Sequence, residues 1–378
     1  MATQRTIVFV WDNFGPMHHD RLKAAAEYFK GTFSVSGIEI ADKSNTYAWV
    51  GEQAELYKKQ TLFTKETSEN ISRWRCFRAL THAIMKSRAK HIFLCNYERS
   101  YIFFTACILR LSGKKVFIMQ NSKFDDCPRM LPRECLKLIL YYPYNGVLVG
   151  SFRSKDYLSF LGFRKRPKVL GYNTLSLNRI RALSKAKPAP AGTAFEDRHF
   201  TIIARLVPKK NLLMALEAYA IYREKIVEPR LLHIYGNGPL GNEIQEKIKE
   251  KKLEKHIFLH GFVQTEGIAE ALGKTLVLIL PSIEEQFGNV VIEAQAMGLP
   301  VIASESCGAC DELVRSGING FTIKPDAPKS LACFMQKLCE DKVLWTNMCE
   351  KAHKFAPLGD VKRFVKGVET LITINHHE

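Results

Sequence analysis

Short apolar runs and longer amphipathic segments alternate along the chain. The apolar runs of the first half have the length of buried strands and are rich in β-branched and aromatic residues. They lie at residues 6–11, 33–40, 91–96, 115–120 and 146–151. Segments with helical spacing of apolar side chains lie at residues 19–29, 100–113 and 154–163. This alternation predicts a parallel sheet with helices on both of its faces.

A break rich in proline and alanine separates this pattern from a second one. Residues 184–200 contain two prolines and a glycine, which interrupt both helical and strand periodicity. Strand-like runs then follow at residues 200–205, 231–236, 256–263, 276–282 and 300–304, and helical segments at 211–226, 240–253, 266–272, 289–298 and 309–316. We interpret the break as a linker between two domains of the same type.

Two domains are also expected from the length, because 378 residues exceed what a single core usually holds. We predict an α/β fold with a Rossmann-like domain over residues 1–190 and a second over residues 191–359. The segment 360–374 is amphipathic and predicts a helix. We expect residues 360–378, which contain this helix, to pack back on the first domain. Doubly wound sheets bind ligands at the carboxyl ends of their strands, so we expect the domains to face each other across a ligand-binding cleft.

Composition narrows the class of protein. With 46% hydrophobic and 25% charged residues, the chain is typical of a globular protein. No apolar run has the length of a membrane span, and the amino-terminal segment lacks the features of a secretory signal. The ten cysteines are interpreted as reduced thiols. Together these features predict a cytoplasmic protein.

The positive charge is confined to the first half of the chain. Residues 1–190 contain 32 Lys and Arg against 14 Asp and Glu, a net +18, whereas residues 191–378 contain 23 against 24, a net −1. Nucleic-acid binding is disfavoured because no helix-turn-helix, RNP or zinc-finger pattern accompanies the charge. A solvated basic face and attraction to an anionic membrane or a phosphate-bearing substrate both remain open.

The segment 281–304 carries the most specific candidate chemistry. Glu285 and Glu293 flank Gly288 and Asn289, where a helix is expected to begin after a buried strand. Free backbone amides of Asn289, Val290 and Val291 would form an anion site, which the glycine would let a ligand approach. Carboxylates accept hydrogen bonds from sugar hydroxyls, so this pattern favours a nucleotide sugar. Alternatively, Glu293 is a surface residue of the helix and Glu285 a loop charge.

Other strand ends supply candidate phosphate ligands. Arg205 ends one predicted strand and Lys210 follows near a helix start, an arrangement that suits a diphosphate. Gly236 and Asn237 lie in a glycine-rich turn that lacks the full spacing of an NAD-binding fingerprint. Gly15 follows the first strand, where it could face phosphates. A solvated basic loop and ordinary turns are the alternatives.

Five segments of the second half, in this order, resemble one known family. They are ARLVPKKN (204–211), YGNGPL (235–240), HGFV (260–263), the segment 281–304, and CGACDELVRSGINGF (307–321). The sequence is similar to the retaining glycosyltransferases of the GT-B fold that carry a Glu–seven residues–Glu motif, family 4, also called glycosyl transferases group 1. The first half is similar only in layout and in the Gly15 loop.

The resemblance implies a role for each matching position. Arg205 and Lys210 would hold the donor diphosphate, Glu285 the transferred sugar, and Glu293 the ribose. Backbone groups would contact the sugar and phosphates, and the residues after Gly261 would lie near the base. The remaining donor-binding positions implied in this way are Gly15, Gly236, Asn237, Phe262, Val263, Phe287, Gly288, Asn289 and Val290.

The sequence departs from the family at one place. Many relatives have a histidine after the fourth strand of the first domain, whereas the corresponding stretch, 117–129, has Gln120 and no histidine; His18 and His19 lie in another loop. This stretch either binds the acceptor or is a solvated loop. Its candidate acceptor residues are Asn121, Lys123, Asp125, Asp126 and Arg129. The adjacent aspartates do not form the Asp-x-Asp metal motif of the other glycosyltransferase fold, so neither a catalytic metal nor a cofactor is expected.

These features predict an enzyme that transfers a sugar, with retention, from a nucleotide diphosphate sugar to a glycan or lipid-linked acceptor in surface polysaccharide or glycolipid synthesis. UDP is favoured because it is common in the family. Basic segments 73–78, 114–116 and 163–168 would hold the protein on the cytoplasmic face of a membrane. The alternatives are a nucleotide-sugar epimerase of the same fold and a non-enzymatic binder of nucleic acid or lipid.

Overall fold

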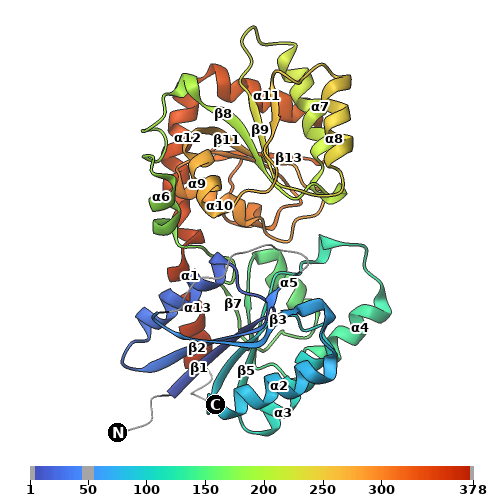
Figure 1. Cartoon of the computed structure of the whole chain (residues 1–378), viewed down its shortest axis with the longest axis vertical. Helices are drawn as coiled ribbons and strands as arrows, with labels where there is room; N and C mark the ends of the chain where they lie inside the picture. The colour runs from blue at the N-terminus through green and yellow to red at the C-terminus, as the bar shows by residue number, and fades with distance from the viewer. Residues whose placement is uncertain (1–4, 45–54, 375–378) are drawn as a thin grey trace. The chain divides into compact units, whose positions relative to one another are not determined.

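The computed structural model describes residues 5–44 and 55–374 and divides into two compact units (Figure 1). The first unit consists of the chain up to Phe124, Pro128–Thr174, and the residues from Val361 onward. The second consists of Leu175–Asp360 together with Asp125–Cys127. Within the described ranges, no helix combines the length and the apolar character needed to cross a membrane.

The first unit is built on a seven-stranded sheet in which all neighbouring strands are parallel, in the order β3-β2-β1-β4-β5-β6-β7. Its strands are β1 (Arg5–Trp11), β2 (Phe33–Lys43), β3 (Lys58–Thr67), β4 (His91–Leu94), β5 (Lys115–Gln120), β6 (Gly146–Val149) and β7 (Lys168–Leu170). The three central strands β1, β4 and β5 are almost fully buried. They read as continuous apolar runs because helices cover both faces of the sheet.

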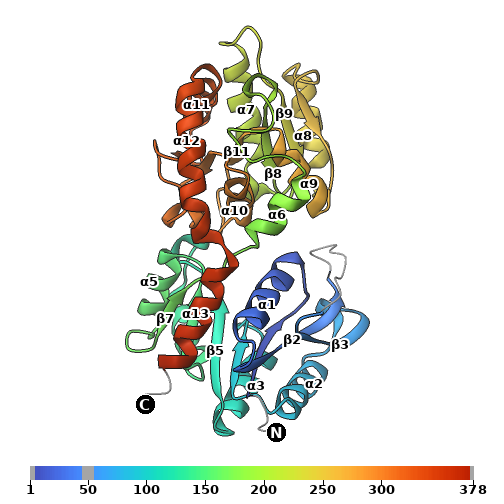
Figure 2. The ribbon, with the colours of Figure 1, turned by 90° about the vertical axis from the view of Figure 1, so that its left-hand side faces the viewer.

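Helices and aromatic side chains fill the two faces of this sheet. The helices are α1 (Pro16–Tyr28), α2 (Arg73–Lys86), α3 (Ser100–Leu111), α4 (Leu131–Leu140), α5 (Phe152–Phe160) and α13 (Val361–Ile374). On one face Phe9, Phe93 and Phe117 stack in a row under α13, the last described helix. Figure 2 shows α13 against this unit, where it contacts β6 and β7.

The second unit has a six-stranded parallel sheet in the order β10-β9-β8-β11-β12-β13. Its strands are β8 (His199–Ile203), β9 (Leu232–Tyr235), β10 (Ile257–Leu259), β11 (Thr275–Leu280), β12 (Val301–Ser304) and β13 (Gly320–Ile323). Its helices are α6 (Leu177–Ser184), α7 (Leu212–Arg223), α8 (Gly241–Glu250), α9 (Thr265–Gly273), α10 (Asn289–Ala296), α11 (Pro328–Glu340) and α12 (Lys342–Phe355). The prediction of two doubly wound α/β domains is confirmed.

Several elements differ from the prediction: no strand was predicted at β3, β7 or β13 and no helix at α2, α4, α6, α11 or α12. Strand β3 was not predicted because it lies at the sheet edge, where half-exposed polar residues interrupt the apolar pattern. Because of β3, the strand in which the stretch 117–129 begins, β5, is the fifth of the domain and not the fourth. The helix predicted at 309–316 is only the single turn η5 (Gly308–Asp311), after which the chain enters β13.

The boundary between the units lies earlier in the chain than residue 190. Helix α6 belongs to the second unit, where it packs against α9 and α10, and the change of unit occurs after Thr174. The proline-containing segment that follows α6 hydrogen-bonds within the second unit, as in the 2.8 Å bond from the Ala189 amide to the Met297 carbonyl. Of the predicted returning segment, residues 361–374 form α13 in the first unit, and residues 375–378 lie outside the described ranges.

Candidate functional site

The second unit has a topological switch point between β8 and β11. The chain leaves β8 toward β9 on one side and leaves β11 toward β12 on the other. The loops that follow the carboxyl ends of these two neighbouring strands therefore diverge and leave room for a ligand between them. Arg205 and Lys210 come from the loop after β8, and Glu285 comes from the loop after β11.

Two of the predicted catalytic residues meet at this point. The Lys210 ammonium donates a hydrogen bond to the Glu285 carboxylate, and each side chain is only 14% exposed. The backbone joins the same two loops, since the Ile283 amide donates to the Lys209 carbonyl at 2.9 Å. A cation and a carboxylate that are 75 residues apart in the sequence are thus held together in a partly desolvated position.

Helix α10 begins beside this pair. Gly288 has φ +98° and ψ 71°, a left-handed conformation, and a Cβ atom there would lie 2.8 Å from Leu280 Cδ2. Glycine is thus required both by conformation and by space. The Val291 amide bonds the Gly288 carbonyl at 3.0 Å, so the expectation that this amide is free is wrong. The amides of Asn289 and Val290 lie in the first turn of α10.

A third loop clamps the segment that carries Glu285. The Cys307 thiol donates to the Phe287 carbonyl at 2.7 Å, and the Ala309 amide donates to the same oxygen at 2.8 Å. The Gly308 amide bonds the Glu285 carbonyl at 3.2 Å. Burial, with Cys310 adjacent, raises the pKa of Cys307 well above its usual value, which keeps the thiol protonated and able to donate.

The roles of Cys307 and Cys310 were not predicted from the sequence. The motif CGACDELVRSGINGF was noted only as part of the resemblance, although Cys307 and Cys310 have Cys-x-x-Cys spacing. None of the ten cysteines, all of which lie in the described ranges, forms a disulfide bond. The signal in the sequence was the glycine at position 308, between these cysteines. The structure explains it, because a Cβ atom there would lie 2.0 Å from the Gln286 carbonyl oxygen.

The glycine-rich turn after β9 packs directly on the loop that contains Arg205. Gly236 has φ +142°, and a Cβ atom there would lie 1.9 Å from the Ala204 carbonyl oxygen. The Gly236 amide donates to the Gly261 carbonyl at 2.7 Å, and the Leu206 amide donates to the Asn237 carbonyl at 2.9 Å. The loops after β8, β9 and β10 are therefore tied together by backbone bonds.

The remaining predicted donor residues differ in exposure. Phe262 is 48% exposed at the end of β10, while the Phe287 side chain is buried, so any ligand contact by Phe287 must come from its backbone. Val263, Val290 and Glu293 are half-buried. Glu293 lies one turn beyond Asn289 along α10, on the same face of the helix.

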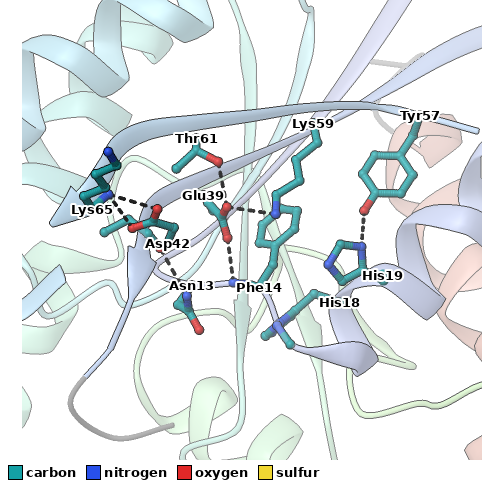
Figure 3. Close-up of polar contacts among 12 residues, drawn as sticks. Asn13, Phe14, His18, His19, Glu39, Asp42, Tyr57, Lys59, Thr61 and Lys65 are labelled. Atoms are coloured by element: carbon teal, nitrogen blue, oxygen red, sulfur yellow. Dashed lines mark hydrogen bonds and ion pairs between the residues drawn. The ribbon is translucent and has the colours of Figure 1, made fainter. Parts of the chain in front are cut away.

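In the first unit, the loop after β1 is held by a buried carboxylate (Figure 3). Glu39, on β2, accepts the Phe14 amide at 2.9 Å and the Thr61 hydroxyl at 2.7 Å, and pairs with the Lys59 ammonium at 2.9 Å. Its side chain is 2% exposed. Gly15 comes next and precedes α1; its φ of −108° does not itself require glycine.

Two histidines belong to the first turn of α1 and not to a loop as predicted. His18 Nδ1 accepts the Gly15 amide at 2.9 Å, and His19 Nδ1 bonds the Tyr57 hydroxyl at 2.6 Å (Figure 3). Burial, with Arg21 and His19 nearby, lowers the pKa of His18 well below its usual value. His18 is therefore neutral, as its role as an acceptor requires.

A second polar cluster at the end of β1 was not predicted. The Asp12 carboxylate pairs with the Arg99 guanidinium at 2.8 Å and accepts the Tyr101 hydroxyl at 3.1 Å. Burial raises the pKa of Asp12, and the charge of Arg99 opposes that shift. The partners come from the segment after β4, and no sequence spacing indicates that they meet.

The candidate acceptor stretch after β5 is divided between the units, since Asp125 and Asp126 belong to the second unit while Asn121 and Arg129 bond residues of the first. Asn121 and Asn173 exchange amide hydrogen bonds of 3.1 and 2.8 Å. Lys123 is fully buried, Asp126 is buried and Asp125 is exposed. The Arg129 guanidinium turns back to the carbonyls of this loop, including that of Phe124 at 2.8 Å. These partners argue against the alternative that the whole stretch is a solvated loop.

Some of the basic side chains of the first unit donate hydrogen bonds to backbone carbonyls of the same unit. Arg166 donates to the carbonyls of Tyr141 and Tyr144 at 2.7 and 2.8 Å, and Lys168 donates to the Phe163 carbonyl at 2.5 Å. In the same segment, Arg164 and Lys165 are exposed. Across residues 5–44 and 55–374, no three His, Cys, Asp or Glu side chains are grouped as metal ligands.

Comparison with known proteins agrees with this geometry. Residues 185–357 match the family model described as glycosyl transferases group 1. The chain is 30% identical over 169 residues to a poly(glycerol-phosphate) alpha-glucosyltransferase of Bacillus subtilis, covering 45% of this chain and 25% of that protein. It is 31% identical over 147 residues to a UDP-Gal:alpha-D-GlcNAc-diphosphoundecaprenol alpha-1,3-galactosyltransferase of Escherichia coli, covering 38% and 37%. The chain thus matches well under half the length of either relative.

Solved structures share the fold over the whole chain. A sucrose-phosphate synthase of Thermosynechococcus elongatus has a TM-score of 0.75 at 17% identity and covers 99% of this chain and 100% of its own. Anabaena HepE, solved with UDP and glucose, has a TM-score of 0.73 at 17% identity, with 98% and 100% covered. The family match and the shared fold identify this chain as one that carries a glycosyl transferases group 1 domain within the two-domain GT-B fold.

Proposed function

We propose that the protein is a retaining glycosyltransferase of the hexosyltransferase class. It moves a sugar from a nucleotide diphosphate sugar, with UDP-sugars favoured, to a hydroxyl of a glycan or lipid-linked saccharide. The observation that carries the proposal is the Lys210–Glu285 pair at the switch point of the second unit. The names of the two curated relatives, one of which includes a UDP-sugar, support this class of donor and acceptor.

The pair is suited to exchange partners when a donor binds. Lys210 would turn to the diphosphate and Glu285 to a hydroxyl of the transferred sugar, so that each charge gains a new partner as it loses the old one. Arg205, whose side chain is exposed in the loop after β8, and the first amides of α10 would add positive charge toward the same diphosphate. Stabilising the departing nucleoside diphosphate in this way is the main catalytic contribution that we assign to these residues.

Retention follows from the course that the family implies. The bond between the anomeric carbon and the phosphate oxygen breaks, and the acceptor oxygen bonds the same face of that carbon. The acceptor proton passes to the departing phosphate. Since Lys210, Arg205 and the helix end already supply positive charge, we propose that no metal or other cofactor is needed, and chelator should leave the rate unchanged.

We further propose that the protein acts in surface polysaccharide or glycolipid synthesis, on the cytoplasmic face of a membrane. The net +18 of residues 1–190 supports attraction to anionic lipid, with about 1 kcal/mol for each basic residue near the surface. Arg166 and Lys168 donate hydrogen bonds to backbone carbonyls within the fold, so less of the positive charge of segment 163–168 is available to lipid. Nucleic acid is not among the proposed partners, because the charge lacks a recognition motif.

Thermal stabilisation by UDP, GDP, ADP and their sugars tests the donor. A ligand at about 100 times its dissociation constant adds about 2.7 kcal/mol to the stability, so the right nucleotide should raise the melting temperature clearly. The absence of stabilisation by every nucleotide would contradict the proposal.

Product analysis with donor alone separates the transferase from an epimerase. An epimerase would convert the sugar nucleotide without acceptor, whereas a transferase releases nucleoside diphosphate together with free or transferred sugar. An electrophoretic shift with mixed DNA and RNA would instead indicate the non-enzymatic binder.

A further inference from the structure

Helix α4 has its apolar face turned away from the unit to which it belongs. Its only buried residue is Glu134, whereas Leu131 is 73% exposed and Ile139 is 61% exposed. Leu131, Cys135 and Ile139 follow one another at a spacing of four and so form one stripe along the helix. In an ordinary surface helix the stripe would face the core and the carboxylate would face water.

The inward side of α4 is fixed by polar bonds. Glu134 accepts hydrogen bonds from the Lys137 ammonium, at 2.8 Å, and from the Tyr157 hydroxyl. Arg129 lies 3.8 Å from the same carboxylate. Burial would raise the pKa of Glu134, but the bonds from Lys137 and Tyr157 outweigh it and hold the pKa below its usual value. The helix therefore cannot rotate its leucines inward without breaking the bonds of Glu134 and Lys137 to Tyr157, which belongs to α5.

The exposed apolar surface continues beyond the helix. The ring of Phe124 lies 6.2 Å from that of Phe160, and these two side chains are 57% and 59% exposed. Leu138 lies beside Gly162, at the end of α5. Figure 1 shows α4 at the outer edge of the first unit. We name this surface the α4 face; its residues are Phe124, Leu131, Cys135, Leu138, Ile139, Tyr142 and Phe160.

The part of the chain that forms the α4 face is rich in positive charge, although Lys123 is buried and Arg166 and Lys168 donate to backbone carbonyls. Residues 123–168 contain ten Lys and Arg against four Asp and Glu, a net +6. Arg133, Arg164 and Lys165 are exposed. An apolar stripe with basic residues around it has the chemistry of a surface that lies in the headgroup region of an anionic bilayer. A protein partner or a second copy of this chain would need acidic groups to match this charge.

We propose that the α4 face docks on an anionic lipid bilayer, with the apolar stripe inserted at the headgroup boundary. The proposal rests on the membrane setting of the proposed function and identifies the element that makes the contact, which the basic segments 73–78 and 114–116 do not include. Docking needs neither donor nor acceptor, so a failure of sugar transfer and a failure of docking are separate results.

Sedimentation with vesicles tests the proposal. The full chain should bind vesicles of mixed phosphatidylglycerol and phosphatidylcholine and not those of phosphatidylcholine alone. The double variant Leu131→Gln, Ile139→Gln should bind at least about tenfold more weakly, because two apolar side chains no longer leave water. The control is Leu111→Gln, which changes an 89% exposed leucine elsewhere on the same unit and should bind like the parent protein.

A fluorescent label reports the depth of insertion. An environment-sensitive dye on Cys135, with the other exposed cysteines Cys127 and Cys333 changed to serine, should shift to the blue on anionic vesicles. The same dye on Cys333 of the second unit, with Cys127 and Cys135 as serine, should not shift.

Three results would overturn the proposal. They are no binding of the parent protein to anionic vesicles at low salt, equal binding by the double variant, or a dye on Cys135 that reports water throughout. Loss of a dimer in the double variant, measured by size-exclusion chromatography, would assign the α4 face to a second copy of the chain. Unchanged melting temperatures and unchanged stabilisation by nucleotide would show that the double variant is folded.

Discussion

The loops at the strand ends of the two units are built by different means. In the second unit, the loops after β8, β9, β11 and β12 are joined chiefly by backbone bonds, and glycines such as Gly236 and Gly308 allow the close approach. In the first unit, the loop after β1 is held by a buried side chain, Glu39, with partners on β3. A site built from backbone needs glycine at fixed positions, whereas a site built from side chains can be assembled from many residue combinations.

The largest expected effect comes from the pair at the switch point. Lys210→Ala should lower the rate of sugar transfer by about 100–1000-fold, because a preorganised charge at the leaving diphosphate is lost. Steady-state kinetics with the donor identified by thermal shift measures this. Lys247→Ala removes a lysine of α8 that pairs only locally with Glu250 and serves as the control. A folded Lys210→Ala protein with nearly normal turnover would contradict the assignment of the site.

Gly236→Ala tests whether the second unit depends on its backbone packing. The left-handed φ and the 1.9 Å approach to the Ala204 carbonyl should cost at least about 2 kcal/mol of unfolding free energy and weaken nucleotide binding. Gly241→Ala is a matched control in the same turn, since a Cβ there would only touch Leu206 Cδ1 at 3.8 Å. Denaturant unfolding and nucleotide titration give both quantities, and equal effects of the two variants would contradict the explanation.

Glu39→Gln tests the side-chain construction of the first unit. The amide can keep a bond to the Phe14 amide but loses the ion pair with Lys59, so we expect a loss of about 1–2 kcal/mol in unfolding free energy. Nucleotide stabilisation of the second unit should not change. The exposed pair of Glu66 with Arg75 offers the control Glu66→Gln, which should have little effect. If the two variants were equally harmless, Glu39 would not be what holds the loop.

Both units should lose stability as the pH falls, because each contains buried or partly buried histidines. Burial lowers the pKa of His199 to about 3 and that of His233 to about 4, and it also lowers the pKa of His18 in the first unit. The unfolded chain then binds more protons than the folded one between these values and about 6.5, so stability falls as the pH falls through this window.

The contribution of His233 can be isolated by mutation. His233→Phe removes a titrating ring from the stack with His260 and should recover on the order of 1 kcal/mol of the stability lost between about pH 6.5 and pH 4, after allowance for solvent screening. Urea unfolding across that range measures the slope. An unchanged slope would mean that other groups dominate the acid sensitivity.

The sequence by itself predicted two doubly wound α/β domains and most of the strands of both sheets, whereas the donor-site residues stay a prediction. Buried strands in a parallel sheet are apolar throughout, so their runs are visible without neighbours. Gly288 could be singled out because close backbone packing restricts the residue type there, whereas the roles of Lys210 and Glu285 stay predictions from their charge, their positions and the family resemblance. The polar edge strand β3 was missed and the single turn η5 was predicted as a longer helix, since their pattern depends on which side chains the neighbouring elements cover.

The tertiary structure alone decided which distant residues meet. It brought Lys210 to Glu285, the Cys307 loop to Phe287, and Glu39 to Phe14. It also decided the orientation of α4, whose sequence is equally compatible with leucines facing the core; the bonds of Glu134 and Lys137 to Tyr157 of α5 hold the polar side inward. Such choices depend on partners far apart in the chain, and the energy of a buried charge depends on those partners more than on its own neighbours in sequence.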